Sequence, residues 1–264
     1  MYRGRLLFGG LLLLAGALFL LNNLGFLPAA AGDLFWPLLL VFAGLWILLR
    51  RSAGPAVLER EPVRVAVDGE SAATLRIKHG AGRLTIGSSK EPAVLLEGTA
   101  AGGVQLSRRR NGSSTELELS VPSDRLLDLP FAWGSGFEWD LRLTPEVDWT
   151  LVLETGAGET RLALTELAVR NLLLKTGASS TEVDLPAVAG QAKVRVESGV
   201  SSVVLRVPAS TAARIQVQSG LADIQVDGSR FPQTAGVYQS ADYETASSRI
   251  DIDIQTGVGS VKVS

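Results

Sequence analysis

The segment LLLKTGASSTEVDLPAVAGQAKVRVESGVSSVVL, residues 172–205, contains one short phrase twice, with glycines at Gly177 and Gly199. The phrase recurs as LRIKHGAGRLTI (75–86), LVLETGAGETRL (151–162), IQVQSGLADIQV (215–226) and IDIQTGVGSVKV (252–263). From Gly156 to Gly220, successive glycines stand 21, 22 and 21 residues apart. A fixed period of this length is typical of a solenoid, whose stacked coils bury each other's apolar faces. We therefore predict an all-β, solenoid-like repeat domain.

The hydrophobic pattern of the phrase predicts two strands in each copy. Counted from the glycine, the positions five and three before it, and one, four and six after it, are apolar in nearly every copy; Thr160 and Thr181 are the exceptions. The positions four and two before the glycine are mostly polar. Alternation on both sides of a glycine indicates two half-buried strands joined at a corner. We expect all five apolar positions to face the core.

The phrase glycines are predicted to make the corners, because an abrupt turn favours a residue that adopts positive φ or a bulge without a Cβ clash. The residue before each glycine is a threonine or serine, except for His79 in the first copy. Stacked coils would align these hydroxyls into a ladder. The six turn glycines are Gly80, Gly156, Gly177, Gly199, Gly220 and Gly257.

Two intervals between the glycines are longer than one coil. The first holds additional strand patterns at 93–97, 104–109 and 115–121, and Asn111-Gly112 predicts a hairpin turn between the last two. The second, before Gly257, contains a polar insertion with Phe231, Pro232, Tyr238 and Tyr243. We expect this insertion to form a loop on one edge of the stack.

The beginning of the chain predicts a transmembrane helical hairpin over residues 1–51. The runs 6–27 and 34–49 are apolar, and the first is long enough to cross a hydrocarbon core about 30 Å thick. Tryptophan and arginine favour the membrane interfaces. We expect five residues to act as interface anchors: Arg3, Arg5, Trp36, Arg50 and Arg51. Residues 52–62 then form a linker to the β-repeat domain at 63–264.

Arginines flank both ends of the hairpin, and its loop has only Asp33, so the positive-inside rule places the β domain in the cytoplasm. Cleavage as a signal peptide after Ala29–Ala31 is the alternative, but the apolar run exceeds the ordinary 7 to 15 residues of such a segment. The β domain faces outward if residues 34–49 fail to span. The lipid bilayer is therefore one expected partner, and multi-pass insertion in a membrane the expected location.

Composition excludes several classes of function. The net charge is -2, whereas nucleic-acid-binding proteins usually have a basic face and a high isoelectric point, so we do not expect a nucleic-acid partner. The chain has no cysteine and one histidine, His79, which lies in a corner position. The sequence therefore does not supply the convergent histidines or cysteines that catalytic triads and zinc sites require. We expect neither catalytic activity nor a cofactor nor a metal.

Two segments are candidate partner surfaces. Arg108, Arg109 and Arg110 form a compact basic run that suits an acidic partner or anionic headgroups, although charged hairpin tips are also common for solubility. The aromatic segment 131–139 suits either a partner or a cap over the open end of the solenoid. Its large side chains are Phe131, Trp133, Phe137 and Trp139.

The hairpin, LLLLAGALFLLNNLGF followed by FWPLLLVFAGLWILLRR, resembles the LiaI/LiaF-type transmembrane region of bacteria, with Asn23, Gly25, Trp36 and Pro37 carrying the likeness. The segment GFEWDLRLTPEVDWTLVLETGAGETRLALTEL resembles the toast-rack β-repeat domains of the adhesin-like and LiaF C-terminal groups. This resemblance implies an inner-membrane protein that modulates an envelope-stress pathway by contacting another membrane protein, such as a sensor histidine kinase. The alternative is an outward-facing adhesin or polysaccharide-binding module. A homo-oligomer is compatible with either function.

Overall fold

The structure is a computed structural model that describes residues 60–91, 93–122 and 137–264, all within one compact unit, Val57–Ser264. These residues form strands and connecting turns, which confirms the predicted all-β fold. Six long strands carry the glycine phrases: β2 (Ala72–Ser88), β7 (Asp148–Ala163), β8 (Val169–Asp184), β9 (Gln191–Arg206), β10 (Ala212–Val226) and β13 (Arg249–Val263). Seven shorter strands complete the fold: β1 (Arg60–Ala66), β3 (Val94–Ala101), β4 (Gln105–Asn111), β5 (Ser114–Ser120), β6 (Phe137–Leu143), β11 (Gln233–Thr234) and β12 (Val237–Gln239).

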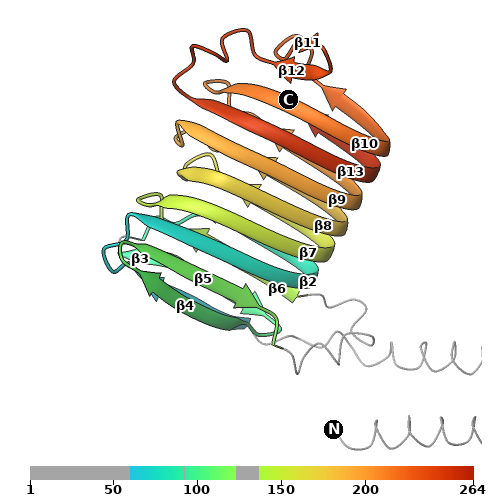
Figure 1. The fold of residues 1–264 in the computed structure, drawn as a ribbon. Helices are drawn as coiled ribbons and strands as arrows, with labels where there is room; N and C mark the ends of the chain where they lie inside the picture. Colours follow the sequence, from blue (N-terminus) through green and yellow to red (C-terminus); the bar gives the residue numbers. More distant parts are fainter. Residues whose placement is uncertain (1–59, 92, 123–136) are drawn as a thin grey trace, which may run out of the picture. The chain divides into compact units, whose positions relative to one another are not determined.

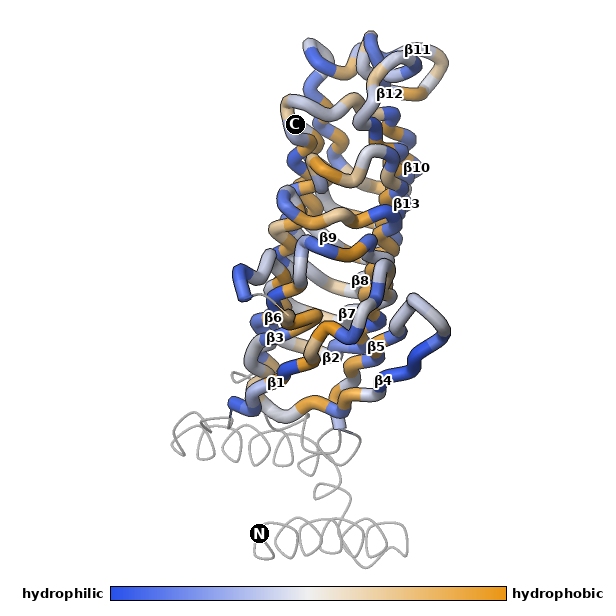
Figure 2. The backbone as a smooth tube through the Cα atoms, turned by 90° about the vertical axis from the view of Figure 1, so that its left-hand side faces the viewer, coloured by the Kyte–Doolittle hydropathy of each residue, from blue (hydrophilic) through white to orange (hydrophobic). Residues whose placement is uncertain are grey.

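Each long strand bends at its phrase glycine, so the halves before and after it form two facing layers (Figures 1 and 2). The first half of β2 pairs with β5, whereas its second half pairs with β6. β6 then pairs with β3, and β3 with β1. The predicted hairpin is confirmed, because β4 and β5 pair in antiparallel register around Gly112. β1 begins at Arg60, inside the predicted linker 52–62.

The core lies between the two layers. On β2, Leu75 and Ile77 of the first half and Leu84 and Ile86 of the second are completely buried. The positions that alternate with them are half-buried or exposed, apart from Gly87. Four of the five apolar positions of the phrase therefore face the core as predicted, and Thr160 and Thr181 are buried in the same rows.

The fifth apolar position was predicted wrongly. The residue directly after each glycine faces solvent, and Leu221, Val200 and Val258 are 81%, 60% and 46% exposed. Alternation explains why: the buried positions of the second half are the fourth and sixth after the glycine, so the first must point the other way. The corner is therefore apolar on its outside.

The phrase glycines are required for close packing rather than for positive φ, contrary to our expectation. A Cβ on Gly156 would lie 2.5 Å from the carbonyl oxygen of Gly80, and one on Gly177 would lie 2.6 Å from that of Gly156. Positive φ instead occurs two residues later, at Gly82 and Gly158. The glycines of neighbouring coils thus stack with no room for a side chain between them.

The order of the coils departs from the order of the chain. The long strands stack as β2, β7, β8, β9, β13 and β10, so the last strand is inserted between β9 and β10 in parallel register with both. The insertion before β13 carries β11 and β12, and β12 pairs with β10 at the edge of the first layer. Phe231 and Tyr243 of this insertion are buried. Its edge position agrees with the prediction, but it forms a small hairpin.

Candidate interaction surfaces

An open groove of about 1090 Å³ runs across all six coils beside the corner. Each coil contributes the two residues before its phrase glycine, and most contribute the glycine as well. The outer row, in stacking order, is Lys78, Glu154, Lys175, Glu197, Gln255 and Gln218. The inner row is His79, Thr155, Thr176, Ser198, Thr256 and Ser219.

The charges of the outer row largely neutralise one another. Lys175 Nζ lies 3.1 Å from Glu197 Oε2, and Lys78 Nζ lies 2.9 Å from Glu118 Oε1 on β5. The hydrogen bond from Lys175 lowers the pKa of Glu197, against the smaller opposing effect of burial. Because these side chains are largely exposed, each pair adds little stability. The groove therefore presents alternating charges without a dominant sign.

The inner row forms the predicted hydroxyl ladder in part. Ser198 Oγ on β9 donates to Thr256 Oγ1 on the inserted strand β13 over 2.9 Å. Thr176 instead bonds Ser179 of its own strand. Thr155 Oγ1 is buried and has no partner among the described residues. The ladder is continuous only where β9 and β13 meet.

His79 occupies a structural position at the first corner. Its side chain is buried, with its ring centroid 5.0 Å from that of Trp139 and 6.2 Å from that of Phe137, both in edge geometry. Burial lowers its pKa to about 4, although a hydrogen bond with the backbone of Phe137 opposes the shift. The imidazole is therefore neutral at physiological pH and packs as an aromatic side chain.

The aromatic segment is not the surface that we considered. Phe137 and Trp139 lie on β6 and are 5% and 0% exposed, so the predicted partner role of these two residues is wrong. They close the core at the end of the stack where β6 joins β2, as a cap would. Phe131 and Trp133 lie outside the described residues.

The arginine run lies on an exposed edge strand. Every residue of β4 is exposed, and among the described strands β4 pairs only with β5. Arg108 Nη2 donates to Glu70 Oε1 over 2.5 Å, and Arg110 pairs with Asp68. Arg109 forms no ion pair with any residue of 60–122 or 137–264. One arginine of the run is therefore available to a partner.

Glu70, which the sequence did not single out, anchors this hairpin. Its side chain is fully buried and accepts hydrogen bonds from Arg108, Thr115 Oγ1 and the backbone N–H of Asp68. Burial alone would raise its pKa, but the backbone and side-chain hydrogen bonds together lower it to about 2. Arg108 is thus held by a buried carboxylate and serves a structural role.

We expect Glu70 to make the stability of the domain pH-dependent. Its folded pKa is depressed, so its contribution is complete above the unfolded value of 4.5 and is lost as the pH falls towards 2. The contribution at neutral pH is on the order of 3 kcal/mol. Urea denaturation at pH 6 and pH 3 should show a smaller acid loss for Glu70→Gln than for the wild type. Glu116→Gln, on the exposed face of β5, is the control, and an equal acid loss in all three proteins would contradict the assignment.

The described residues contain no group of three or more metal-binding side chains and no helix long and apolar enough to cross a bilayer. The predicted membrane runs 6–27 and 34–49 lie outside the described residues. The same holds for their anchors, Arg3, Arg5, Trp36, Arg50 and Arg51. The prediction for this region is tested only by comparison with known proteins.

A two-layer stack of bent strands following an apolar N-terminal segment defines the class of membrane-anchored toast-rack β proteins. The family described as the N-terminal domain of toast_rack, DUF2154, matches residues 55–206, and the LiaF transmembrane domain matches residues 7–61. The chain belongs to the toast-rack family and is membrane-anchored through a LiaF-type segment. The resemblance inferred from the sequence is thereby confirmed.

One solved structure agrees with the fold. A candidate cell adhesion protein from Clostridium sporogenes has a TM-score of 0.69 at 21% identity, covering 78% of this chain and 98% of its own. A candidate adhesin from Bacteroides fragilis has a TM-score of 0.27 at 8% identity, covering 78% of this chain and 97% of its own, and supports no argument. No curated protein matches the sequence. The first likeness shows the fold alone.

Proposed function

We propose that this protein is a membrane-anchored, non-enzymatic regulator that modulates an envelope-stress sensor histidine kinase by direct contact. The proposal rests on one observation, which is the match of a LiaF transmembrane domain directly before a toast-rack domain. The corner histidine is buried and neutral, and no metal-binding group occurs among the described residues. These features favour binding over catalysis.

The β4 edge is the surface that best suits a protein partner. Its outer backbone groups face no neighbouring strand among the described residues, so an extended segment of another chain can add to the sheet. Arg109 and Ser107 lie on one face of β4, and Leu106 is 38% exposed on the other. An acidic, extended segment of the kinase would complement this strand.

The test is site-specific cross-linking in bacterial cells. A photoreactive residue replacing Ser107 should capture a histidine kinase, and Arg109→Glu should reduce both the capture and the change in an envelope-stress reporter. Lys193→Glu, an equal charge reversal on the exposed face of β9, should alter neither. Normal capture and reporter output in Arg109→Glu would remove the β4 edge from the proposal, and loss of the whole protein without any reporter change would refute the regulatory role.

A second function, an outward-facing adhesin, is favoured by the likeness to the candidate cell adhesion protein, which at 21% identity supports the fold more than the role. Topology distinguishes the two functions. We propose a cytoplasmic β domain, so a fluorescent protein fused after residue 264 should be fluorescent and an alkaline phosphatase fused there inactive. The reverse result would favour the adhesin.

A further inference from the structure

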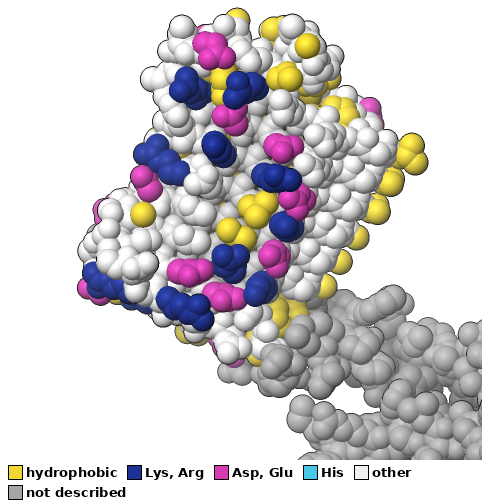
Figure 3. Space-filling model, viewed as in Figure 1, with side chains coloured by type: hydrophobic (Ala, Val, Ile, Leu, Met, Phe, Trp, Pro, Cys, Tyr) yellow, Lys and Arg dark blue, Asp and Glu magenta, His cyan; other side chains and the backbone are white. Residues whose placement is uncertain are grey.

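The residues that follow the phrase glycines form one exposed row along the corner, which we name the apolar file. Strand register places each member beside the next across the stack. Figure 3 shows the hydrophobic side chains in a straight line along one edge of the molecule. In stacking order, the apolar file is Ala81, Ala157, Ala178, Val200, Val258 and Leu221.

The residues directly beside the apolar file are small and uncharged. The phrase glycines flank it on one side, and on the other lie residues no larger than serine, such as Gly158 and Ser201. At about 4.8 Å between strands, the file is about 24 Å long. Soluble proteins rarely expose a continuous apolar surface that no partner covers. The core does not require these side chains, because they point away from it.

The side chains of the apolar file increase in size along the stack, from three alanines through two valines to Leu221. Two such files therefore fit each other only when they run in opposite directions. Leu221 of one copy then meets Ala81 of the other, and Val200 meets Ala178. In a parallel arrangement, Leu221 would meet Leu221 and hold the alanine ends apart. We propose that two copies of this chain associate through the apolar file, in antiparallel orientation about a two-fold axis.

The charges beside the apolar file match the same orientation. The row three residues after the glycines runs Arg83, Glu159, Ser180, Ser202, Ser260 and Asp223 in stacking order. Antiparallel pairing sets Arg83 of one copy opposite Asp223 of the other, and Glu159 opposite Ser260. In the outer row of the groove, Lys175 comes opposite Glu197. No two like charges face each other, and a two-fold axis makes each contact twice.

The size of the surface predicts weak association. Three rows of small residues over about 24 Å bury less than the ~1,200 Å² of a standard stable interface. A shared membrane anchor raises the effective concentration of the copies, which favours such a contact in the bilayer. An anionic lipid surface fits less well, because the flanking rows contain four acidic and three basic side chains.

Thiol cross-linking of the full-length chain in membranes tests the orientation. The sequence has no cysteine, so single cysteines act without background. Differently tagged Ala81→Cys and Leu221→Cys proteins, co-expressed and treated with a short bis-maleimide, should form a mixed dimer. Each alone should give no cross-link, because like positions lie about 24 Å apart in the antiparallel pair. Cross-links between like positions only, or none at all, would overturn the proposal.

Charge reversal supplies a second readout. Arg83→Asp and Asp223→Arg should each lower the yield of the mixed dimer at least threefold, and the double variant should restore it. Lys193→Asp on β9 should leave the yield unchanged. Circular dichroism confirms folding of each variant. Protection of Leu221→Cys from maleimide by phosphatidylglycerol vesicles, without any mixed dimer, would assign the apolar file to the bilayer and refute self-association.

Discussion

Replacing Gly158 with alanine is expected to destabilise the domain by about 3 kcal/mol or more. Gly158 has a φ of +135°, a conformation that side-chain-bearing residues rarely adopt, and an added Cβ would lie 1.9 Å from the carbonyl oxygen of Gly82. The contact is with backbone in the next coil, so it is relieved only by separating β2 from β7. Urea denaturation monitored by circular dichroism measures the loss.

Gly80→Ala is the matched control for this substitution. A Cβ on Gly80 has no atom within 4 Å, and its φ is not positive. We therefore expect a change of less than about 1 kcal/mol, in the stabilising direction, from reduced freedom of the unfolded chain. Equal effects of the two substitutions would show that contact between coils does not determine the requirement for glycine.

The repeat could be predicted because coil packing leaves a periodic trace in the sequence. Leu172 and Leu174 before Gly177, and Val183 after it, repeat in each copy, and all are buried. The Asn111-Gly112 hairpin was equally local, since its turn chemistry lies within two residues. Local patterns and short periods therefore defined the strands, the corners and the class of fold.

The solvent-facing orientation of the apolar file could have been predicted from the hydrophobic pattern of the phrase, but we expected it to face the core. The buried apolar residues before the glycine lie an odd number of residues from it, namely five and three. Those after the glycine lie an even number of residues from it, namely four and six. After the bend, positions at an even distance from the glycine therefore face the core and those at an odd distance face solvent. The first residue after the glycine belongs to the solvent-facing set. Leu221 and Val200 could have been assigned to the surface on this ground.

Long-range features left no such trace. Phe137 and Trp139 belong to a segment whose pattern allowed either a partner surface or a cap, and β6 places both against His79 across a large sequence separation. No sequence pattern singled out Glu70, which the fold buries between Arg108 and Thr115. Their roles depend on which strands become neighbours, which one sequence does not specify.

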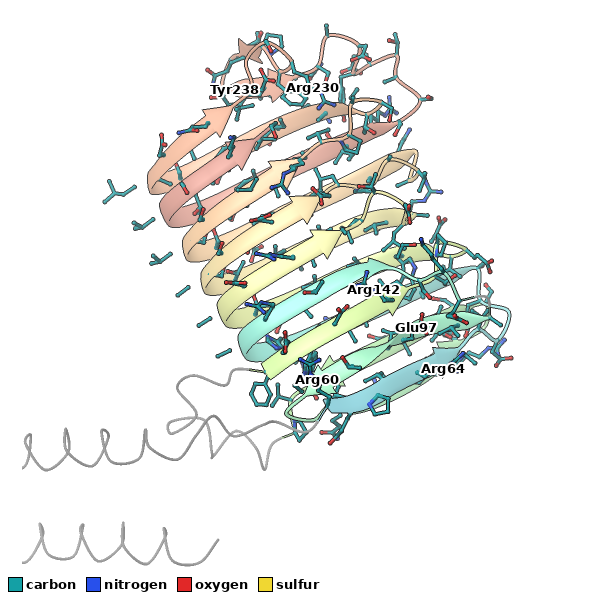
Figure 4. All side chains as sticks on the ribbon, turned by 180° about the vertical axis from the view of Figure 1, so that it is seen from behind. Arg60, Arg64, Glu97, Arg142, Arg230 and Tyr238 are labelled. Carbon is teal, nitrogen blue, oxygen red and sulfur yellow. The ribbon has the colours of Figure 1, made fainter. Side chains whose placement is uncertain are left out.

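The insertion of β13 between β9 and β10 is a further long-range feature that the repeat pattern does not indicate (Figure 4). Arg230 of the intervening segment donates to the carbonyl oxygens of Val207 and Thr211, which secures the connection beside β10. β10 does not pair with β9 and has β13 as its parallel partner. Sequence order predicts β13 as the outermost coil, and the structure makes it internal.

Deleting residues 249–264 should consequently abolish cooperative unfolding of the region from β9 onwards. Both β9 and β10 would lose a partner along nearly their whole length, and buried Ile252, Ile254 and Val261 would be removed from the core. Limited proteolysis should then cleave within 207–248, sites that resist cleavage in the intact domain. If the coils instead stacked in chain order, the deletion would shorten the stack by one outer coil and leave β10 protected.

A single substitution in β13 tests whether loss of core packing alone has the same effect as deleting the strand. Val261 is 1% exposed in the core-facing row, whereas its neighbour Lys262 is exposed on the same strand. Val261→Asp buries an unpaired carboxylate and should reproduce the protease sensitivity of the deletion, with a destabilisation of several kcal/mol. Lys262→Asp carries the same new side chain on the solvent face and should remain within about 0.5 kcal/mol of the wild type. Because β13 joins β10 to the rest of the stack, only the inward-facing change should release both strands.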